Sequence, residues 1–376
     1  MAPTVPRAAY IHVPFCRHRC GYCDFAVIAG RDELVDAYLA ALSRELSWLG
    51  EPRPVETLYI GGGTPNHLDL RQLERLCDAV LARHPLAARG EWTVESNPES
   101  LTAEQLQLLA GRGVTRISLG VQSFDDAKLR TLDRQHAGAD AQRAVARALT
   151  AGLDVSLDLI FAAPGETLSA WRRDLQTALA TGAAHISTYG LTFEQGTAFG
   201  VARARGAMRE ADEELQRALY AAAIDDLTAA GFEHYEVSNF ARPGRRSRHN
   251  QVYWAAQEYF AAGPGAARYV DGVRETNVRS TLTYLARVER GQSPVAQREE
   301  LPPESRARER LVLGLRRRSG VAKRSFAEAT GFEVDALAGA AIARFAALGL
   351  MTDDGQSVQL TRDGLMVSDA LWPELL

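Results

Sequence analysis

Short apolar runs rich in β-branched and aromatic residues alternate, over the first half of the chain, with segments whose apolar residues recur every three or four positions. The runs predict β-strands, and the longer spacing, as from Leu34 through Leu42 to Leu49, predicts amphipathic helices. Thr102 followed by Gln105 has the capping-box spacing of a helix start. This alternation favours a parallel sheet covered by helices, either open or curled into a partial barrel. The six predicted strands are residues 9–13, 56–60, 92–95, 115–119, 154–161 and 185–191.

The second half of the chain has a different pattern. A long helical pattern over residues 210–230 ends the alternation, and residues 242–264 are basic and aromatic without a regular period. Helical patterns then return at 304–318, 325–330 and 334–348, and Asp353-Asp354-Gly355 is typical of a turn between two short strands. Three helices and a hairpin indicate a small winged-helix-like module. We therefore expect an α/β chain with a partial (β/α)6 barrel over residues 1–240, a basic and aromatic connector over 241–300, and the C-terminal module over 301–376.

The composition is that of a globular chain with a large core. The 376 residues are 46% hydrophobic and 24% charged, and 43 basic against 47 acidic side chains give a net charge of −4. A dedicated nucleic-acid binder usually carries a strongly basic face, so we expect no nucleic-acid partner. There is no run of 18 apolar residues, and the first nine residues lack the apolar core of a signal peptide. We therefore expect a cytoplasmic location.

The strongest chemical signal is a group of three cysteines. Cys16, Cys20 and Cys23 form a C-x3-C-x2-C run, which is too local for the disulfide framework of a small secreted protein. Thiolates are soft ligands that suit iron–sulfur clusters or zinc. Three cysteines can hold three irons of a [4Fe–4S] cube and leave the fourth iron open. A zinc site needs a fourth ligand, which His12 or His18 could supply, so both metal centres stay open on spacing alone.

Polar or glycine-rich residues stand at the end of nearly every predicted strand. The carboxyl ends of parallel strands meet at one edge of a sheet or barrel, where ligands bind. Residues 61–65 form a glycine run that fits either a tight turn or a ligand-binding loop, since it has neither phosphate-loop nor dinucleotide spacing. Taken singly, each polar residue is more typical of a cap or a surface position. Together they predict one shared site, formed by Glu95, Gln122, Arg134 and Asp158.

Two other features have structural explanations. Cys77 lies in a helical apolar pattern and is expected in the core. Arg316, Arg317 and Arg318 end a predicted helix, where cations offset the helix dipole, so we expect a solvated helix end.

Several motifs together identify a family. The chain resembles the radical S-adenosylmethionine proteins related to the oxygen-independent coproporphyrinogen III oxidase, from Tyr10 into the C-terminal module. Cys23-Asp24-Phe25 and residues 249–254 resemble the haem-chaperone branch of that family. The motifs are Tyr10-Ile11-His12-Val13-Pro14-Phe15-Cys16, Cys20, Cys23-Asp24-Phe25, Gly61–Pro65, Glu95-Ser96-Asn97-Pro98, Gly120–Phe124, Asp158-Leu159-Ile160 and His249-Asn250-x-x-Tyr253-Trp254.

The resemblance implies a [4Fe–4S] cluster on the three cysteines and S-adenosylmethionine on its open iron. Arg134 offers a planar fork to the cofactor carboxylate, and the glycine loop offers backbone groups to its amine. One-electron reduction of the bound cofactor would release a 5′-deoxyadenosyl radical. The residues that correspond to cofactor contacts in the related oxidase are Tyr10, Tyr22 through its backbone, Gly62, Gly63, Thr64, Glu95, Gln122, Arg134, Asp158 and Gly190.

The resemblance also distinguishes between two functions, decarboxylation of coproporphyrinogen III and haem delivery. The oxidase has a further cysteine two residues after the third, where this chain has Phe25, and a long N-terminal extension, where this chain has 15 residues before Cys16. Decarboxylation of coproporphyrinogen III is therefore not expected, and haem binding and delivery are favoured. The alternative is a radical enzyme acting on a porphyrin or other substrate, so enzymatic activity stays open and no catalytic residue is assigned.

Haem would then be a further ligand. His249 is the candidate axial ligand, although a lone histidine among arginines is more often a hydrogen-bonded surface residue. Tyr253 and Trp254 would line the porphyrin. The arginines expected to pair the two propionates are Arg245, Arg246 and Arg248.

The remaining expectations concern partners. The resemblance implies a haem-acceptor protein and an electron donor for the cluster, with membrane contact only peripheral and through the acceptor. One position departs from the family pattern: Ala267 stands where haem-chaperone-like chains usually have histidine after Gly-Ala, so any role of that histidine is absent.

Overall fold

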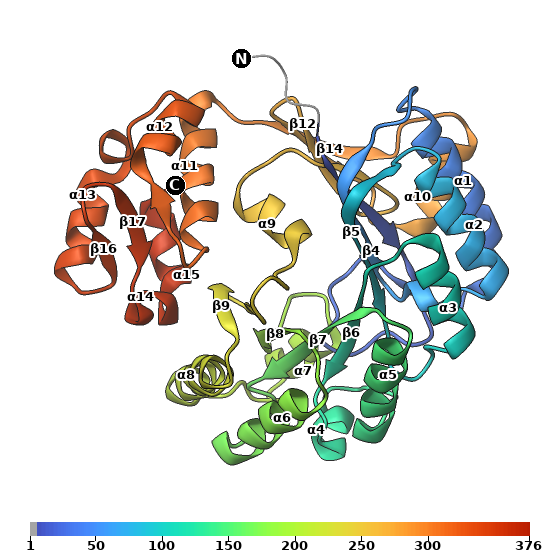
Figure 1. Cartoon of the computed structure of the whole chain (residues 1–376), viewed down its shortest axis with the longest axis horizontal. Coiled ribbons are helices and arrows are strands. Elements are labelled where there is room, and N and C mark those ends of the chain that lie inside the picture. The colour runs from blue at the N-terminus through green and yellow to red at the C-terminus, as the bar shows by residue number, and fades with distance from the viewer. Residues whose placement is uncertain (1–5) are drawn as a thin grey trace.

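A nine-stranded sheet forms the centre of the molecule in the computed structural model, which describes residues 6–376 (Figure 1). The strand order is β11-β1-β4-β5-β6-β7-β8-β10-β9, and the two edge strands do not pair with each other, so the sheet is an open, partial barrel as predicted. The bounds are β1 (Ala8–Val13), β4 (Val55–Gly62), β5 (Leu86–Ser96), β6 (Arg116–Gln122), β7 (Asp154–Phe161), β8 (His185–Gly190), β9 (Glu233–Glu236), β10 (Asn239–Ala241) and β11 (Phe260–Ala262).

All six predicted strands are confirmed as the parallel core of this sheet, and they are β1, β4, β5, β6, β7 and β8. Each pairs in parallel with its neighbour, as where Tyr10 faces Tyr59 and Asp158 faces Ser187. Their carboxyl ends therefore lie at one edge, where the loops that follow can meet. A two-stranded ribbon, β2 (Phe15–Cys16) with β3 (Ile28–Ala29), follows β1 at that edge.

Helices cover the outer face of the sheet and bury their apolar stripes against it (Figure 1). Thr102 and Gln105 form the predicted capping box, and Cys77 is fully buried in this core, as expected. No helix in the described part of the chain is long and apolar enough to cross a lipid bilayer. The bounds are α1 (Val35–Ser47), α2 (Leu70–Leu81), α3 (Ala103–Arg112), α4 (Asp126–Thr131), α5 (Gly138–Thr150), α6 (Leu168–Ala180), α7 (Ala198–Ala204) and α8 (Glu213–Ala229).

The segment predicted to be an irregular connector is instead ordered and belongs partly to the barrel. β11 pairs in parallel with β1, with Phe260 facing Ala9 and Ala262 facing Ile11. Its strands are too short to produce a periodic signal, which is why the sequence pattern missed them. Figure 1 places α9 on the inner side of the sheet, between the sheet and the C-terminal helices. The other elements are α9 (Arg248–Trp254), β12 (Ala267–Val270), β13 (Val273–Asn277), α10 (Thr281–Glu289) and β14 (Val295–Glu300).

The C-terminal module has the predicted three helices and hairpin, packed around a core of its own. Its sheet has the order β15-β17-β16. The elements are α11 (Pro303–Leu315), α12 (Lys323–Thr330), α13 (Val334–Ala347), β15 (Val321–Ala322), β16 (Met351–Asp353), β17 (Ser357–Leu360), α14 (Arg362–Met366) and α15 (Ser368–Leu371).

The expectation of a solvated arginine run at the end of α11 is wrong. All three arginines are half-buried against the barrel and the module. The Arg316 guanidinium lies 4.6 Å from the centre of the Trp254 ring, and Arg318 Nη1 donates to the Leu360 carbonyl at 3.1 Å. The barrel packs against this end of α11, and a helix pattern alone does not reveal such a neighbour.

Candidate functional site

The loop after β1 brings the three cysteines to the carboxyl edge of the sheet. Cys16 ends β2, and the Cys23 N–H donates to the Cys20 carbonyl at 3.0 Å, which folds the loop back on itself. All three residues are half-buried. Cys16 Sγ lies 3.4 Å from Thr64 Oγ1, and Cys20 Sγ lies 3.5 Å from Arg134 Nη1. The cysteine loop therefore touches the loops that follow β4 and β6.

Both histidines considered as zinc ligands have other partners. The ring of His12 is buried, with Nδ1 3.0 Å from the Tyr10 hydroxyl and Nε2 2.9 Å from the Ala26 carbonyl. His18 Nε2 lies 2.8 Å from the Asp133 carboxylate. Across residues 6–376, no three His, Cys, Asp or Glu side chains gather around the position of one metal ion. Ligands of a single zinc ion must meet at one point, whereas cysteines on separate irons need not, so the donor set fits a cluster.

The glycine run after β4 approaches its neighbours too closely for side chains. Gly62 has a φ of 106°, and a Cβ built there would lie 2.4 Å from the His12 ring. A Cβ on Gly63 would lie 2.6 Å from the Phe15 carbonyl oxygen and 3.1 Å from Cys16 Sγ. Close backbone approach beside the cysteines suits a ligand-binding loop, and this favours the ligand-loop interpretation over a simple tight turn.

Two carboxylates, from β5 and β7, lie inside the barrel near this edge. Glu95 Oε1 accepts from the Tyr59 hydroxyl at 2.7 Å, and Oε2 accepts from the Gly62 N–H at 2.8 Å. Asp158 Oδ2 accepts from Ser118 Oγ at 3.3 Å. Burial raises the pKa of Glu95 to about 7 and the pKa of Asp158 to about 6. A cationic group such as an amine would offset this unfavourable burial of negative charge.

Arg134 and Gln122 complete the edge with groups suited to a carboxylate and to hydroxyls. Arg134 Nη2 donates to Asn97 Oδ1 at 2.7 Å and to the Gly120 carbonyl at 2.8 Å, which fixes the plane of the guanidinium. Gln122 has a φ of 63°, a left-handed conformation that costs a non-glycine residue about 1–3 kcal/mol. Such strain is concentrated at binding sites, and Gln122 is half-buried at this edge of the sheet.

One cavity collects nearly all of the residues predicted for the cluster and its cofactor. It has a volume of about 640 Å³ and extends from the cysteine loop through the barrel to Ser247 and Asn250 at the start of α9. We call it the cofactor cavity. The predicted residues that line it are Cys16, Cys20, Tyr22, Cys23, Gly62, Gly63, Thr64, Glu95, Gln122, Arg134, Asp158 and Gly190.

Three polar residues of this cavity escaped the sequence prediction as individual contacts. Asn97 Nδ2 donates to Thr64 Oγ1 at 3.0 Å, so Asn97 links the glycine loop to Arg134. Ser118 of β6 donates to Asp158, and Ser187 of β8 lies opposite Asp158 in the strand pairing. Polar residues at similar depth in successive apolar strands are the signal that would have found the two serines.

Two predicted residues lie outside the lining of the cofactor cavity. Tyr10 packs beside Tyr59, with ring centres 6.1 Å apart. His249 is buried in α9 with 1% of its surface exposed. Its Nδ1 lies 3.0 Å from Thr57 Oγ1 and its Nε2 lies 2.8 Å from the Tyr253 hydroxyl. Burial lowers the pKa of His249 to about 3, so the imidazole is neutral.

The arginines expected to pair propionates already have carboxylate partners. Arg245 Nη1 lies 2.8 Å from Asp154, and Arg246 Nε lies 2.9 Å from Glu233. Arg248 Nη2 lies 3.4 Å from Glu56 Oε2. The three arginines are exposed, whereas His249 in the same segment is buried, so the structure does not gather them with His249 around one ligand.

Comparisons with known proteins agree with this geometry. Residues 10–178 match the Radical SAM superfamily, and residues 301–367 match the HemN C-terminal domain. The chain is 36% identical to the heme chaperone HemW of Bacillus subtilis (strain 168), across 98% of this chain and 99% of that protein. It is also 36% identical to the heme chaperone HemW of Escherichia coli (strain K12), across 76% of this chain and 77% of that protein.

A solved structure shares the whole fold. Coproporphyrinogen III oxidase (HemN) from Escherichia coli, described as a radical SAM enzyme, superposes with a TM-score of 0.88 at 20% identity. The match covers 100% of this chain and 91% of that one. At this identity the likeness concerns the fold.

Proposed function

Because the chain belongs to the HemW family of radical S-adenosylmethionine proteins, we propose that it is a haem chaperone, which binds haem and passes it to an acceptor protein. The observation that carries this proposal is the 36% identity to a heme chaperone over 98% of the chain. Family membership also implies a [4Fe–4S] cluster and S-adenosylmethionine as cofactors.

The cofactor cavity offers donors for both of these groups. Cys16, Cys20 and Cys23 would hold three irons and leave the fourth open to S-adenosylmethionine. A bound cluster supplies one-electron reduction of that cofactor. The buried carboxylates attract the cofactor's positively charged groups, and Arg134 presents its planar fork to the methionine carboxylate. As part of the same proposal, Gln122 and Asp158 would contact the ribose of S-adenosylmethionine.

His249 remains our candidate for the axial haem ligand. Its neutral ring is the form that coordinates iron, and burial keeps it neutral at physiological pH. Both ring nitrogens are engaged, with Thr57 and Tyr253, so coordination requires one of these two hydrogen bonds to break. Ligation by His249 therefore predicts that α9 rearranges when haem binds.

A haem titration of the anaerobically reconstituted protein tests this function. We expect a saturable Soret band, which His249→Ala weakens and shifts. His67→Ala is the matched control, because His67 does not line the cofactor cavity and pairs with Asp32. A wild-type protein without saturable haem binding would contradict the chaperone function. An unchanged titration for His249→Ala would remove this ligand and leave the chaperone function standing.

Radical chemistry on a porphyrin is the less favoured function. Phe25, with 61% of its surface exposed, stands at the edge of the cofactor cavity where the related oxidase has a further cysteine. Formation of 5′-deoxyadenosine that depends on an added porphyrin would revive this alternative. The electron donor, the identity of the acceptor and the cytoplasmic location stay predictions.

A further inference from the structure

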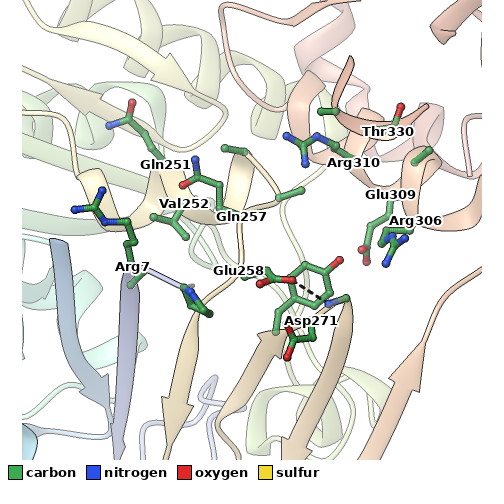
Figure 2. Close-up of a pocket in the computed structure, with 18 of the residues that line it drawn as sticks. Arg7, Gln251, Val252, Gln257, Glu258, Asp271, Arg306, Glu309, Arg310 and Thr330 are labelled. Carbon is green, nitrogen blue, oxygen red and sulfur yellow. Dashed lines mark hydrogen bonds between the residues drawn. The ribbon is translucent and has the colours of Figure 1, made fainter. Parts of the chain in front are cut away.

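A second cavity lies at the opposite end of the barrel, at the amino ends of β1 and β4. It has a volume of about 1140 Å³ and is walled by α9, by the β12–β13 hairpin and by α11 and α12 of the module. Figure 2 shows Arg306, Glu309 and Arg310 of the module across the cavity from Val252 and Gln257. We call it the arginine cavity, because it is lined by Arg7, Arg248, Arg306, Arg310 and Arg317.

Three of these arginines form no ion pair within residues 6–376: Arg306, which is exposed, and Arg310 and Arg317, which are half-buried. Glu56 pairs with Arg7 at 2.6 Å and with Arg248 at 3.4 Å, so the charges on the barrel side are matched. Arg317 donates only to the carbonyls of Gly314 and Gly320, each at a long 3.4 Å.

The environment of the two half-buried guanidiniums favours a bound anion. Burial lowers the pKa of both, and the positive charge of Arg310 lowers the pKa of Arg317 further. A partly desolvated cation without a counterion is unfavourable, and a ligand that supplies negative charge removes this cost. The carboxylate on the same helix does not supply it, because Glu309 Oε1 accepts from Arg274 Nη2 at 2.7 Å.

The rest of the wall has an apolar part and a polar part, and its remaining acidic residues are Glu258, which accepts from the Gly272 N–H at 2.9 Å, and Asp271. Val252 of α9 lines the apolar part together with Ala255 and Ala256, which directly follow α9, and Ala307 lines it from α11. Tyr269 of β12 is half-buried and presents a ring to the same space. Two carboxylate-binding cations beside an apolar and aromatic wall suit a flat, amphipathic dicarboxylate. The volume exceeds the roughly 300–1,000 Å³ of typical small-molecule sites, so the ligand can be large.

We propose that the arginine cavity is the haem-carrying site, in which Arg310 and Arg317 pair the two propionates. This inference rests on the proposed chaperone function and assigns a binding site to the haem. The porphyrin ring packs between the α9 wall and Tyr269.

The location explains how haem and S-adenosylmethionine are kept apart. Ser247 and Asn250 of the α9 segment line the cofactor cavity, whereas Gln251 and Val252 line the arginine cavity. α9 is therefore the partition between the two. His249 lies inside this partition, one hydrogen bond behind Thr57, which itself lines the arginine cavity.

Haem affinity of the cluster-loaded protein, measured by Soret titration, tests the site. The double variant Arg310→Ala/Arg317→Ala is expected to bind haem at least tenfold more weakly, because each lost charge-assisted hydrogen bond costs about a factor of ten. Arg324→Ala is the matched control, since this arginine lies in the same module and is 92% exposed. It is expected to bind haem like the wild type.

A second measurement needs no variant. Haem dimethyl ester keeps the iron and the ring but lacks both negative charges, so the wild type should bind it about as weakly as the double variant binds haem. Metal-free protoporphyrin IX, which keeps the carboxylates, should compete with haem.

The outcomes separate the two proposals. Unchanged haem affinity in the double variant together with equal affinity for the dimethyl ester overturns the arginine cavity as the haem site, while the chaperone function stands. A wild type that binds no haem overturns both.

Discussion

The two cavities of this protein are built in opposite ways. The cofactor cavity lies where six parallel strands end, and its polar groups hold one another in place, as Glu95 does with Tyr59 and Gly62. The arginine cavity is assembled where the barrel, the β12–β13 hairpin and the C-terminal module meet, and two of its half-buried arginines, Arg310 and Arg317, have no acidic partner among the described residues. Preorganisation of this kind suits the resident cofactor that we propose for the first cavity. The second depends on packing between units, which suits a cargo that must also leave.

Replacing all three cluster cysteines should separate the cavities most sharply. We expect Cys16→Ala/Cys20→Ala/Cys23→Ala to lose essentially all cluster iron and sulfide after anaerobic reconstitution, since no other thiol lines the cavity. Haem affinity should change by less than about twofold, because α9 stands between the cavities. Cys77→Ala is the control: it removes a buried core thiol and should keep the cluster. Haem affinity that falls together with iron content would show that the cavities are coupled.

The same contrast explains what the sequence could reveal. Strand–helix alternation places every loop after a strand at one edge, so the amino-acid pattern alone could assign Cys16, Glu95 and Asp158 to one site. Nothing comparable locates Arg310 or Arg317, because a helical pattern shows which face is apolar and not which neighbour covers it. Arg245 and Arg246, which the sequence made the candidate anion binders, are paired instead with acidic residues elsewhere in the chain.

The burial of His249 could not be predicted for a related reason. Its neighbours in sequence are arginines, which are typical of a surface segment. The short helix α9 lies inside the arc of the sheet, with Arg248 exposed and His249 buried against Thr57 and Tyr59. Long-range packing of this kind has no local periodicity. The three-residue strand β11, which holds the following segment against β1, is also too short to give a periodic signal in the sequence.

A buried carboxylate on α1 anchors the wall of the arginine cavity to the barrel. Glu45 accepts from the Gly263 N–H at 2.9 Å, from Asn277 Nδ2 at 2.7 Å and from the Tyr284 hydroxyl at 2.6 Å. Glu45→Ala leaves these buried donors unpaired, and we expect a loss of about 2–4 kcal/mol in the free energy of unfolding. Thermal and denaturant unfolding would measure it.

The comparison between the two cavities suggests a second measurement on Glu45→Ala, namely its haem affinity. The segment from Gly263 to Asn277, which Glu45 anchors at both ends, contains β12 and β13. In Glu45→Ala, haem affinity measured well below the melting temperature should therefore fall, while the cluster content should stay unchanged. Glu33→Ala, at an exposed site just before α1, is the control for both measurements. Equal loss of cluster and haem would mean that Glu45 supports the whole barrel rather than this wall.

The smallest expected effect concerns pH and the cofactor cavity. Burial raises the pKa of Glu95 to about 7 and of Asp158 to about 6, so the native state holds protons that the unfolded chain releases near pH 4. Their contribution to stability is full below pH 4 and is lost as the pH rises through 6 and 7. The melting temperature of the cofactor-free protein should therefore contain a component that falls by several degrees between pH 5 and pH 8.

Neutral replacements isolate that component. In Glu95→Gln/Asp158→Asn this fall should largely disappear, whereas Glu51→Gln, an exposed carboxylate, should leave the wild-type pH dependence unchanged. S-adenosylmethionine brings positive charge to the same carboxylates, so it should raise the wild-type melting temperature more at pH 8 than at pH 5. An identical pH dependence in wild type and double variant would show that the two carboxylates are already ionised and solvated in the cavity. The cofactor cavity would then be less preorganised, and closer in character to the arginine cavity, than its hydrogen bonds indicate.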